Sequence, residues 1–276
     1  MPTATATSAA PATPAAPAHR LIIIPPSHYC EKARWALRLA GVPYTQEAHA
    51  PLLHAPAVKR AGGGRSTPVL VTPEGVLKDS EEILAWLEER PEAAWRPYGG
   101  AALSGEERAA ARGWEERLGR DLGPHTRRFA YFHLLPLPRP LSLECVIDGA
   151  PAWERRWARL AWPLIRWVMR RTMRIDAAGA ARSRERIDSC FEEVAAALAA
   201  NPDGGGERLV GRLLTAADLT FATLAAPVLL APGYGARLPP EELLPTALLT
   251  EVARYRAHPA GRYALRVYEE LARRAP

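Results

Sequence analysis

Ser27 and Cys30 are the first residues of this chain whose types and placement suit thiol chemistry. They follow a short apolar run, Leu21 to Ile24, which reads as a buried strand ended by Pro25 and Pro26. A helix is expected next, and the free N–H groups at a helix start stabilise an anion such as a thiolate. A Ser27 hydroxyl would donate to a bound thiolate and lower its pKa. Capping the helix is the more common role of such a serine, and Cys30 is either a reactive thiol or an inert buried one.

Two further segments carry groups of the same kind. Ser66-Thr67-Pro68-Val69-Leu70 runs into a second apolar strand, and Asp79-Ser80 opens a helix with two acidic residues in its first turn. Neither segment is specific when taken alone, because a Thr-Pro pair precedes many strands and Asp79 or Ser80 is a sufficient helix cap. Their order and spacing over about seventy residues make the combination informative.

The elements that must position these residues form two domains. Strand and helix patterns alternate up to about residue 91, which predicts an α+β domain over 19–91. Proline and glycine mark a linker over 92–103, and no strand is predicted beyond it. Helices are predicted over 104–119, 180–200, 215–230, 239–257 and 261–274, and 134–151 is expected to be irregular. The second domain, 104–276, is therefore all-α, with an enlarged region over 123–180.

Composition limits the remaining possibilities. The 276 residues are 48% hydrophobic and 24% charged, as in ordinary folded proteins, and no apolar run is long enough to cross a bilayer. Residues 1–18 read as a disordered tail and not as a signal peptide. Three widely spaced cysteines predict neither a disulfide framework nor a metal site, which favours a cytoplasmic location. The net charge of +6 equals the surplus of seven arginines over one glutamate in residues 153–174, so the sequence predicts no general affinity for nucleic acid.

The segment SHYCEKARWALRLAGVPY resembles the first helix of glutathione transferases and glutaredoxins. The resemblance implies the glutathione transferase architecture: a thioredoxin-like N-terminal domain followed by an all-helical C-terminal domain. It places Ser27 at the catalytic position of the Ser- and Cys-type classes and Cys30 at the resolving position of glutaredoxins. His28 departs from the proline that is frequent there.

The resemblance also implies a glutathione site with glutathione as co-substrate. A cis Pro68 would let the Thr67 backbone pair with the cysteine part of glutathione, and the Asp79-Ser80 pair would hold its γ-glutamyl group. A guanidinium at Arg65, or the ammonium of Lys59, would pair with the glycine carboxylate. The cofactor-binding residues predicted in this way are Tyr29, Arg65, Thr67, Pro68, Asp79 and Ser80. Downstream, Thr215 and Asp218 resemble the structural capping box of the family's second domain.

The region over 123–180 exceeds what the resemblance accounts for. Tyr131 and Phe132 would line a pocket for a small apolar electrophile, although such aromatic residues are more often part of a core. One face of the arginine-rich helix carries Trp153, Trp157, Leu160, Leu164 and Val168, and Pro163 should kink or restart it. The common interpretation is a helix packed on the core with a solvated arginine face. The alternative is a helix that makes weak contact with an anionic membrane surface or an acidic partner through 153–174.

Three functions remain open. The first is transfer of the glutathione thiol to an electrophile, as in detoxification, by a protein that dimerises as the family usually does. The second is thiol–disulfide exchange or deglutathionylation with Cys30 as nucleophile. The third is a non-catalytic binding or membrane-surface role that keeps the fold, since a fold does not determine its function.

Overall fold

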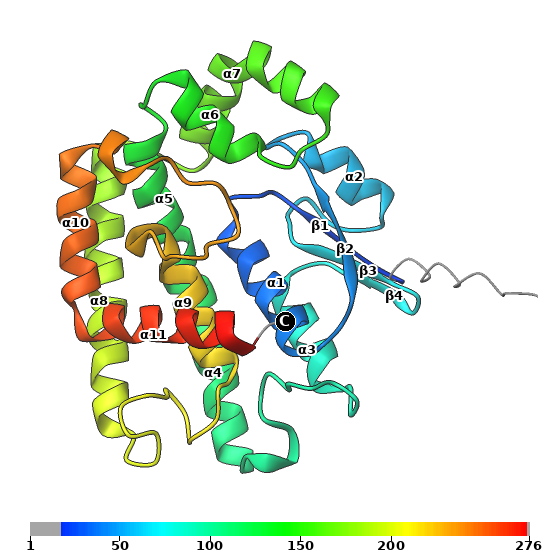
Figure 1. Cartoon of the computed structure of the whole chain (residues 1–276), viewed down its shortest axis with the longest axis vertical. Helices are drawn as coiled ribbons and strands as arrows, with labels where there is room; N and C mark the ends of the chain where they lie inside the picture. The colour runs from blue at the N-terminus through cyan, green and yellow to red at the C-terminus, as the bar shows by residue number, and fades with distance from the viewer. Residues whose placement is uncertain (1–17, 275–276) are drawn as a thin grey trace, which may run out of the picture.

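The computed structural model describes residues 18–274. The N-terminal part of the chain forms a four-stranded mixed sheet with helices (Figure 1). The predicted tail lies outside the described residues except for Ala18. Strands pack in the order β2-β1-β3-β4, with β2 parallel to β1 and the other pairs antiparallel. The elements are β1 (His19–Ile23), α1 (His28–Leu39), β2 (Tyr44–Ala48), α2 (His54–Arg60), β3 (Val69–Thr72), β4 (Gly75–Leu77) and α3 (Ser80–Glu88). This is the predicted thioredoxin-like arrangement.

Alternation along β1 and β3 explains how the sheet is covered on both faces. Leu21, Ile23 and Leu70 belong to the large core that includes α1 and α3. Ile22 and Val69 point the other way, into a smaller cluster with α2. Because β1 has a neighbour on each side and a helix on each face, its buried residues form a continuous apolar run.

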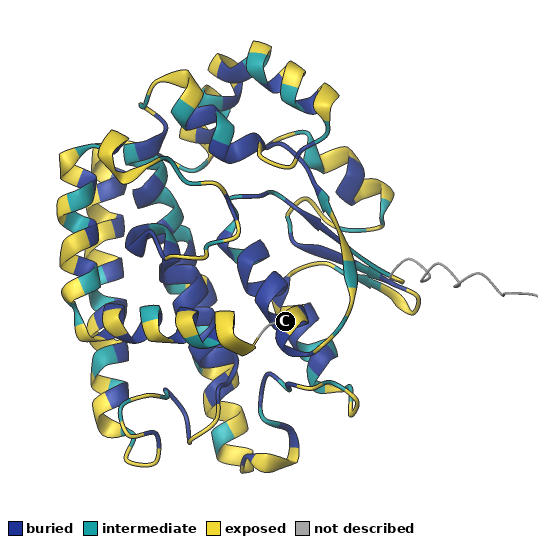
Figure 2. Cartoon of the chain, in the orientation of Figure 1, coloured by how far each residue is buried: buried dark blue, intermediate teal, exposed yellow. Residues whose placement is uncertain are grey.

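The second part of the chain is helical, as predicted. Its helices are α4 (Gly105–Asp121), α5 (Gly123–Leu134), α6 (Arg139–Ile147), α7 (Ala152–Thr172), α8 (Ala177–Ala200), α9 (Ala216–Leu229), α10 (Thr246–Ala257) and α11 (Pro259–Arg274). Short 3₁₀ turns occur at Gly100–Ala102 and Glu241–Leu243. Helix α9 is the central element, because it is buried along almost its whole length and packs against α1, α4, α5, α10 and α11 (Figure 2).

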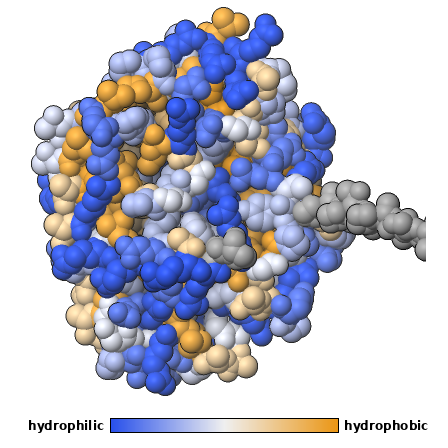
Figure 3. Space-filling view, in the orientation of Figure 1, coloured by the Kyte–Doolittle hydropathy of each residue, from blue (hydrophilic) through white to orange (hydrophobic). Residues whose placement is uncertain are grey.

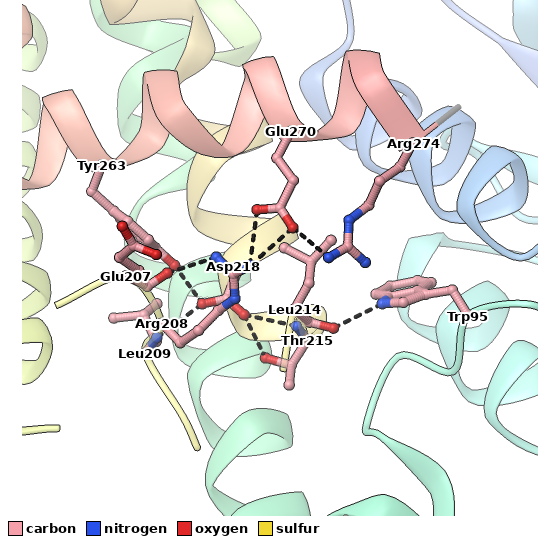
Figure 4. A network of polar contacts seen from close by, with 10 residues as sticks. All are labelled: Trp95, Glu207, Arg208, Leu209, Leu214, Thr215, Asp218, Tyr263, Glu270 and Arg274. Atoms are coloured by element: carbon pink, nitrogen blue, oxygen red, sulfur yellow. Dashed lines mark hydrogen bonds and ion pairs between the residues drawn. The ribbon is translucent and has the colours of Figure 1, made fainter. Parts of the chain in front are cut away.

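A polar network holds the start of α9 in this core (Figure 4). One Asp218 carboxylate oxygen accepts from the Thr215 backbone N–H at 2.7 Å and from the Thr215 hydroxyl at 3.0 Å. The other oxygen accepts from the Leu209 N–H at 2.9 Å and from the Tyr263 hydroxyl. Four donors compensate for burying this carboxyl group, whose pKa burial nevertheless raises. Asp218 therefore has the structural role predicted for it.

Two expectations for the enlarged region are wrong. Residues 139–147 are helical where an irregular stretch was expected, because Pro140 lies in the first turn of α6, where its missing N–H interrupts no helix bond. Helix α7 is also continuous across Pro163.

The face of α7 that was expected to pack on the core is turned to solvent. Trp153, Trp157, Leu160 and Leu164 are exposed, by 84% in the case of Leu160. The residues that pack lie on the opposite face: Ala158, Trp162, Ile165 and Met169. Spacing shows which residues share a face, but the neighbouring elements decide which face is covered.

Candidate functional site

The sheet register brings the three predicted segments to one edge. Antiparallel pairing places Ile22, near the end of β1, beside Val69 at the start of β3. It also places Leu77, at the end of β4, beside Leu70. The residues that follow β1, precede β3 and follow β4 therefore meet at the same end of the sheet. These are the segments 25–30, 65–68 and 78–80.

Ser27, Cys30 and Thr67 form the polar centre of this edge. Ser27 is the N-cap of α1, and its Oγ accepts from the Cys30 backbone N–H at 3.4 Å. Burial raises the pKa of the fully buried Cys30 thiol, while hydrogen bonds with the Ser27 and Thr67 side chains act in the opposite direction. The Thr67–Pro68 peptide bond is cis, as predicted. The arrangement places a half-buried hydroxyl at the positive end of α1.

Asp79 and Ser80 occupy the adjacent helix start. Asp79 Oδ1 accepts from the Glu81 and Glu82 backbone N–H groups at 2.9 and 2.8 Å, so Asp79 is the N-cap of α3. Ser80 is buried and Asp79 is exposed. Capping is thus present at both helix starts, and at Asp79 it leaves an exposed carboxylate beside the sheet edge.

Arg65 lies in the loop that leads into the cis peptide. It is exposed, as is Lys59 at the end of α2, so both cations are accessible to a carboxylate ligand. The Arg65 carbonyl accepts from His54 Nε2 at 3.2 Å, which ties the loop to α2.

His28 and Tyr29 face the helical domain. His28 Nε2 donates to the Gly123 carbonyl at 2.7 Å, and the Tyr29 hydroxyl donates to the Gly119 carbonyl at 2.6 Å. Burial lowers the pKa of His28 to about 3 and raises that of Tyr29 to about 12, so both side chains are neutral donors. The Tyr29 hydroxyl is therefore engaged by α4 and is not free to bind a ligand, unlike its predicted role.

The charged residues of α1 are buried in the same domain interface, which the sequence did not reveal. Lys32 Nζ donates to Glu115 Oε1 of α4 at 2.6 Å, with side-chain exposures of 0% and 2%. Glu31 accepts from Arg34 at 2.6 Å and from the Gly235 N–H at 3.1 Å. The Lys32–Glu115 and Glu31–Gly235 contacts bridge the two domains, so they fix the start of α1 relative to the helices. Their partners lie 83 and 204 positions further along the chain, so no local signal pointed to them.

A small, mainly apolar cavity of about 40 Å³ lies next to the start of α1. Its lining includes Pro26 and His28, the two chain neighbours of Ser27, together with Tyr131 and Cys145 of the helical domain, whereas Ser27 itself is not part of the lining. Tyr131 thus lines a cavity, and its contact with an electrophile stays a prediction. Phe132 is not part of this wall and packs instead against the cluster between α6 and α7.

Arg127 also lines the cavity and was not singled out from the sequence. Its positive charge lowers the pKa of His28 and counteracts the rise at Tyr29, so the guanidinium acts on the start of α1. A cation beside a helix N-terminus favours an anion between them. A basic residue inside an arginine-rich sequence carries no signal of its own, which explains why it was missed.

Within residues 18–274, no group of three or more His, Cys, Asp or Glu side chains is placed to hold a metal ion. None of the helices in this range combines the length and the apolar character that a membrane span requires.

A thioredoxin-like sheet followed by a helical second domain, with Ser27, Cys30 and the cis Thr67–Pro68 peptide at one end of the sheet, defines the class of the fold. Residues 21–95 match the family model described as glutathione S-transferase, N-terminal domain. No curated protein matches the chain significantly in sequence. The N-terminal domain therefore belongs to the glutathione S-transferase family, and the chain as a whole has the glutathione transferase fold.

Solved structures share this fold at low sequence identity. The theta class glutathione S-transferase from Xanthomonas axonopodis pv. citri, with glutathione bound, is 19% identical, covers 90% of this chain and 97% of its own, and has a TM-score of 0.52. A glutathione transferase from Phanerochaete chrysosporium is 15% identical over 94% and 98% of the two chains, with a TM-score of 0.62. The glutathione S-transferase of Ceriporiopsis subvermispora in complex with glutathione is 16% identical over 92% and 97%, with a TM-score of 0.60.

Proposed function

We propose that the protein binds glutathione at this sheet edge and transfers its thiol to a small apolar electrophile. The observation that carries the proposal is the meeting of Ser27, the cis Thr67–Pro68 peptide and Asp79-Ser80 at one end of the sheet, beside an apolar cavity. In this arrangement the Thr67 backbone pairs with the cysteine part of glutathione, Asp79-Ser80 hold the γ-glutamyl group, and Arg65 or Lys59 pairs with the glycine carboxylate.

The thiolate is stabilised by the start of α1. The Ser27 hydroxyl donates to the sulfur, and the α1 dipole and the Arg127 guanidinium favour the negative charge. The lowered thiol pKa supplies a nucleophile at neutral pH. The electrophile contacts the apolar residues around the cavity, Tyr131 among them, and the cavity of about 40 Å³ must widen to admit it.

Burial argues against Cys30 as the nucleophile of the alternative oxidoreductase. A reactive thiol is accessible and has a lowered pKa, whereas the Cys30 side chain is fully buried and its pKa is raised. Replacing Cys30 by Ser is expected to leave conjugation nearly intact. Loss of turnover in Cys30→Ser, with glutathione still bound, would instead favour thiol–disulfide exchange.

Calorimetric titration with glutathione and turnover of an aryl halide test the proposal in wild type and Ser27→Gly. A hydrogen bond to a charged group is worth about 1.5–3 kcal/mol, so the variant should lose roughly ten- to a hundredfold in turnover while its affinity for glutathione stays similar. Glycine is chosen because it costs a helix N-cap only a few tenths of a kcal/mol. Unchanged turnover would exclude Ser27 from the reaction.

Ser104→Ala is the matched control for lost capping. Ser104 caps α4 through its own capping box and lies in no part of the proposed site. Its removal should cost about 1 kcal/mol of stability and leave turnover unchanged. Glutathione binding without any turnover in the wild type would point to the third function, a non-catalytic binding protein, and absence of binding would refute the proposal itself.

A further inference from the structure

Helix α7 exposes an apolar stripe that runs along its length. Residues 18–274 contain eight large apolar side chains that are classed as exposed, and five of them belong to this helix. These five are Trp153, Trp157, Leu160, Leu164 and Trp167. Their spacing of four and three residues places them on one face, over roughly 21 Å of helix. Scattered exposed apolar residues need no explanation, but a continuous stripe of this size marks an interaction surface.

The opposite face of α7 is packed against the rest of the protein, and these contacts fix the orientation of the helix with its apolar stripe exposed. Glu154 is fully buried and bonds His49 Nδ1 at 2.5 Å and the Ala50 N–H at 2.8 Å, in the loop after β2. Trp162, Ile165 and Met169 pack into the cluster with α6. The helix cannot rotate its stripe inward without breaking these contacts.

Arginines flank the stripe, and no acid accompanies them. The helix carries six arginines: Arg155, Arg156, Arg159, Arg166, Arg170 and Arg171. Among the described residues, Arg159 alone of these has a carboxylate partner, Glu144 at 3.0 Å. Glu154, the single acid of the helix, is buried against His49. The outer surface of α7 therefore combines indole rings and leucines with several unpaired positive charges.

The position of α7 leaves this surface accessible. Helices α6 and α7 form one end of the molecule, at the top of Figure 1, outside the bundle around α9. At the same end Figure 3 shows apolar and hydrophilic residues side by side.

We propose that the outer face of α7 docks on an anionic lipid surface, with the indole rings at the headgroup level and the arginines on lipid phosphates. Tryptophan is enriched at membrane interfaces because its ring is apolar and its N–H needs a polar partner. Arginine stems cover apolar surface while the guanidinium reaches out to an anion. An amphipathic helix with both features lies in the plane of the interface and does not cross it.

A second copy of the chain fits the surface less well. If two α7 stripes faced each other, Arg156, Arg170 and Arg171 would meet the same arginines with no carboxylate to pair with. The five apolar side chains are also far fewer than the roughly 20–30 residues that each partner contributes to a stable interface. Charge complementarity therefore favours an anionic occupant.

Co-sedimentation of the full chain with vesicles tests the proposal. Vesicles of phosphatidylcholine with about one-third phosphatidylserine should bind the protein at low salt, and binding should weaken when salt shortens the Debye length to about 10 Å. Vesicles of phosphatidylcholine alone should bind much less. Failure of the wild type to sediment with the anionic vesicles at low salt would overturn the proposal.

Paired variants separate the charge and the apolar contributions. Arg156→Gln, Arg170→Gln and Arg171→Gln together should weaken binding on the order of a hundredfold, because each basic residue near the surface contributes about fivefold. The control removes the same charge elsewhere, through Arg60→Gln, Arg237→Gln and Arg273→Gln, which are exposed and outside α7. Equal losses in both triples would show that net charge alone is responsible and refute a role of α7.

The apolar part has its own control. Leu160→Asn with Leu164→Asn should reduce binding, whereas Leu213→Asn with Leu243→Asn, also exposed, should not. Glutathione affinity should be unchanged in all variants, so the outcome is independent of the proposed transferase reaction. A wild type that forms a dimer in sedimentation equilibrium, dissolved by the Leu160 and Leu164 changes, would assign the stripe to a second copy and refute lipid docking.

Discussion

Removing Lys32 should destabilise the protein strongly, because it leaves a buried carboxylate without its cation. Lys32 Nζ lies 2.6 Å from Glu115 Oε1, and both side chains are almost inaccessible to water. The remaining side-chain partner of Glu115 is the Tyr98 hydroxyl, which donates to Oε2 at 3.2 Å. One neutral donor cannot replace an ammonium group in a dry interface. We expect Lys32→Met to lower the free energy of unfolding by about 3–5 kcal/mol, the usual cost of breaking a buried pair.

The double variant Lys32→Met/Glu115→Leu should recover most of that loss. Replacing both partners removes the unpaired charge together with the cost of desolvating the pair, and such exchanges are often neutral or stabilising. The Tyr98 hydroxyl is then left without its acceptor, so we expect recovery to stop about 1–3 kcal/mol short of the wild type.

Urea unfolding followed by circular dichroism measures these differences, with Arg184→Met as the control for an accessible ion pair. Arg184 pairs with Glu251 at 3.1 Å and is about half exposed, so its loss should cost less than about 1 kcal/mol. A cost below about 1 kcal/mol for Lys32→Met, or a double variant as unstable as the single one, would refute the reasoning. Either result would mean that water reaches Glu115 or that the interface repacks around it.

Two further predictions concern the domain interface. Both ring nitrogens of His49 face carboxylates, Glu154 at 2.5 Å and Glu47 at 2.8 Å, and these raise the pKa of His49 despite its burial. Because the pKa of His49 is higher in the folded protein than its value of about 6.5 in the unfolded chain, its charged form contributes full stability below pH 6.5. The free energy of unfolding should therefore fall as the pH rises through the folded-state pKa. In His49→Gln this fall should be smaller. Gly123→Ala should cost about 1–3 kcal/mol in thermal unfolding, since its Cβ would lie 2.2 Å from the Tyr29 hydroxyl oxygen. Gly113→Ala, with open space around it in α4, should instead stabilise by about 0.5–1 kcal/mol; an equal effect at both positions would contradict the packing explanation.

Local signals in the sequence were sufficient for most elements and for several helix starts, although the helix expected over 239–257 begins only at Thr246. Asp79, Ser104 and the Thr215–Asp218 pair cap the helices that they were expected to start, since capping involves residues within one turn. The cis peptide at Pro68 was expected only through the resemblance to glutathione transferases, and it is present. Proline was the misleading local signal: α6 starts where an irregular stretch was expected, and α7 continues through Pro163.

The neighbours of the site could not be predicted in the same way. Tyr29 was predicted to bind the ligand, but its hydroxyl donates to the Gly119 carbonyl. These two residues are 90 positions apart in the sequence and meet only when the two domains pack. No local signal in the sequence marked Lys32 and Glu31 for burial, which follows from the same packing.

The amino-acid sequence by itself therefore determined the order of strands and helices, several of their caps, and the side chains available for thiol chemistry. These depend on interactions within a few residues, which a single sequence displays. The tertiary structure alone decided that Ser27, Thr67 and Asp79 lie at one end of the sheet, that Arg127 lines the cavity next to His28, and that α7 turns Trp153, Trp157 and Trp167 outward. Those outcomes depend on which surfaces meet in space, and a helix with two apolar faces does not indicate which one its neighbours will cover.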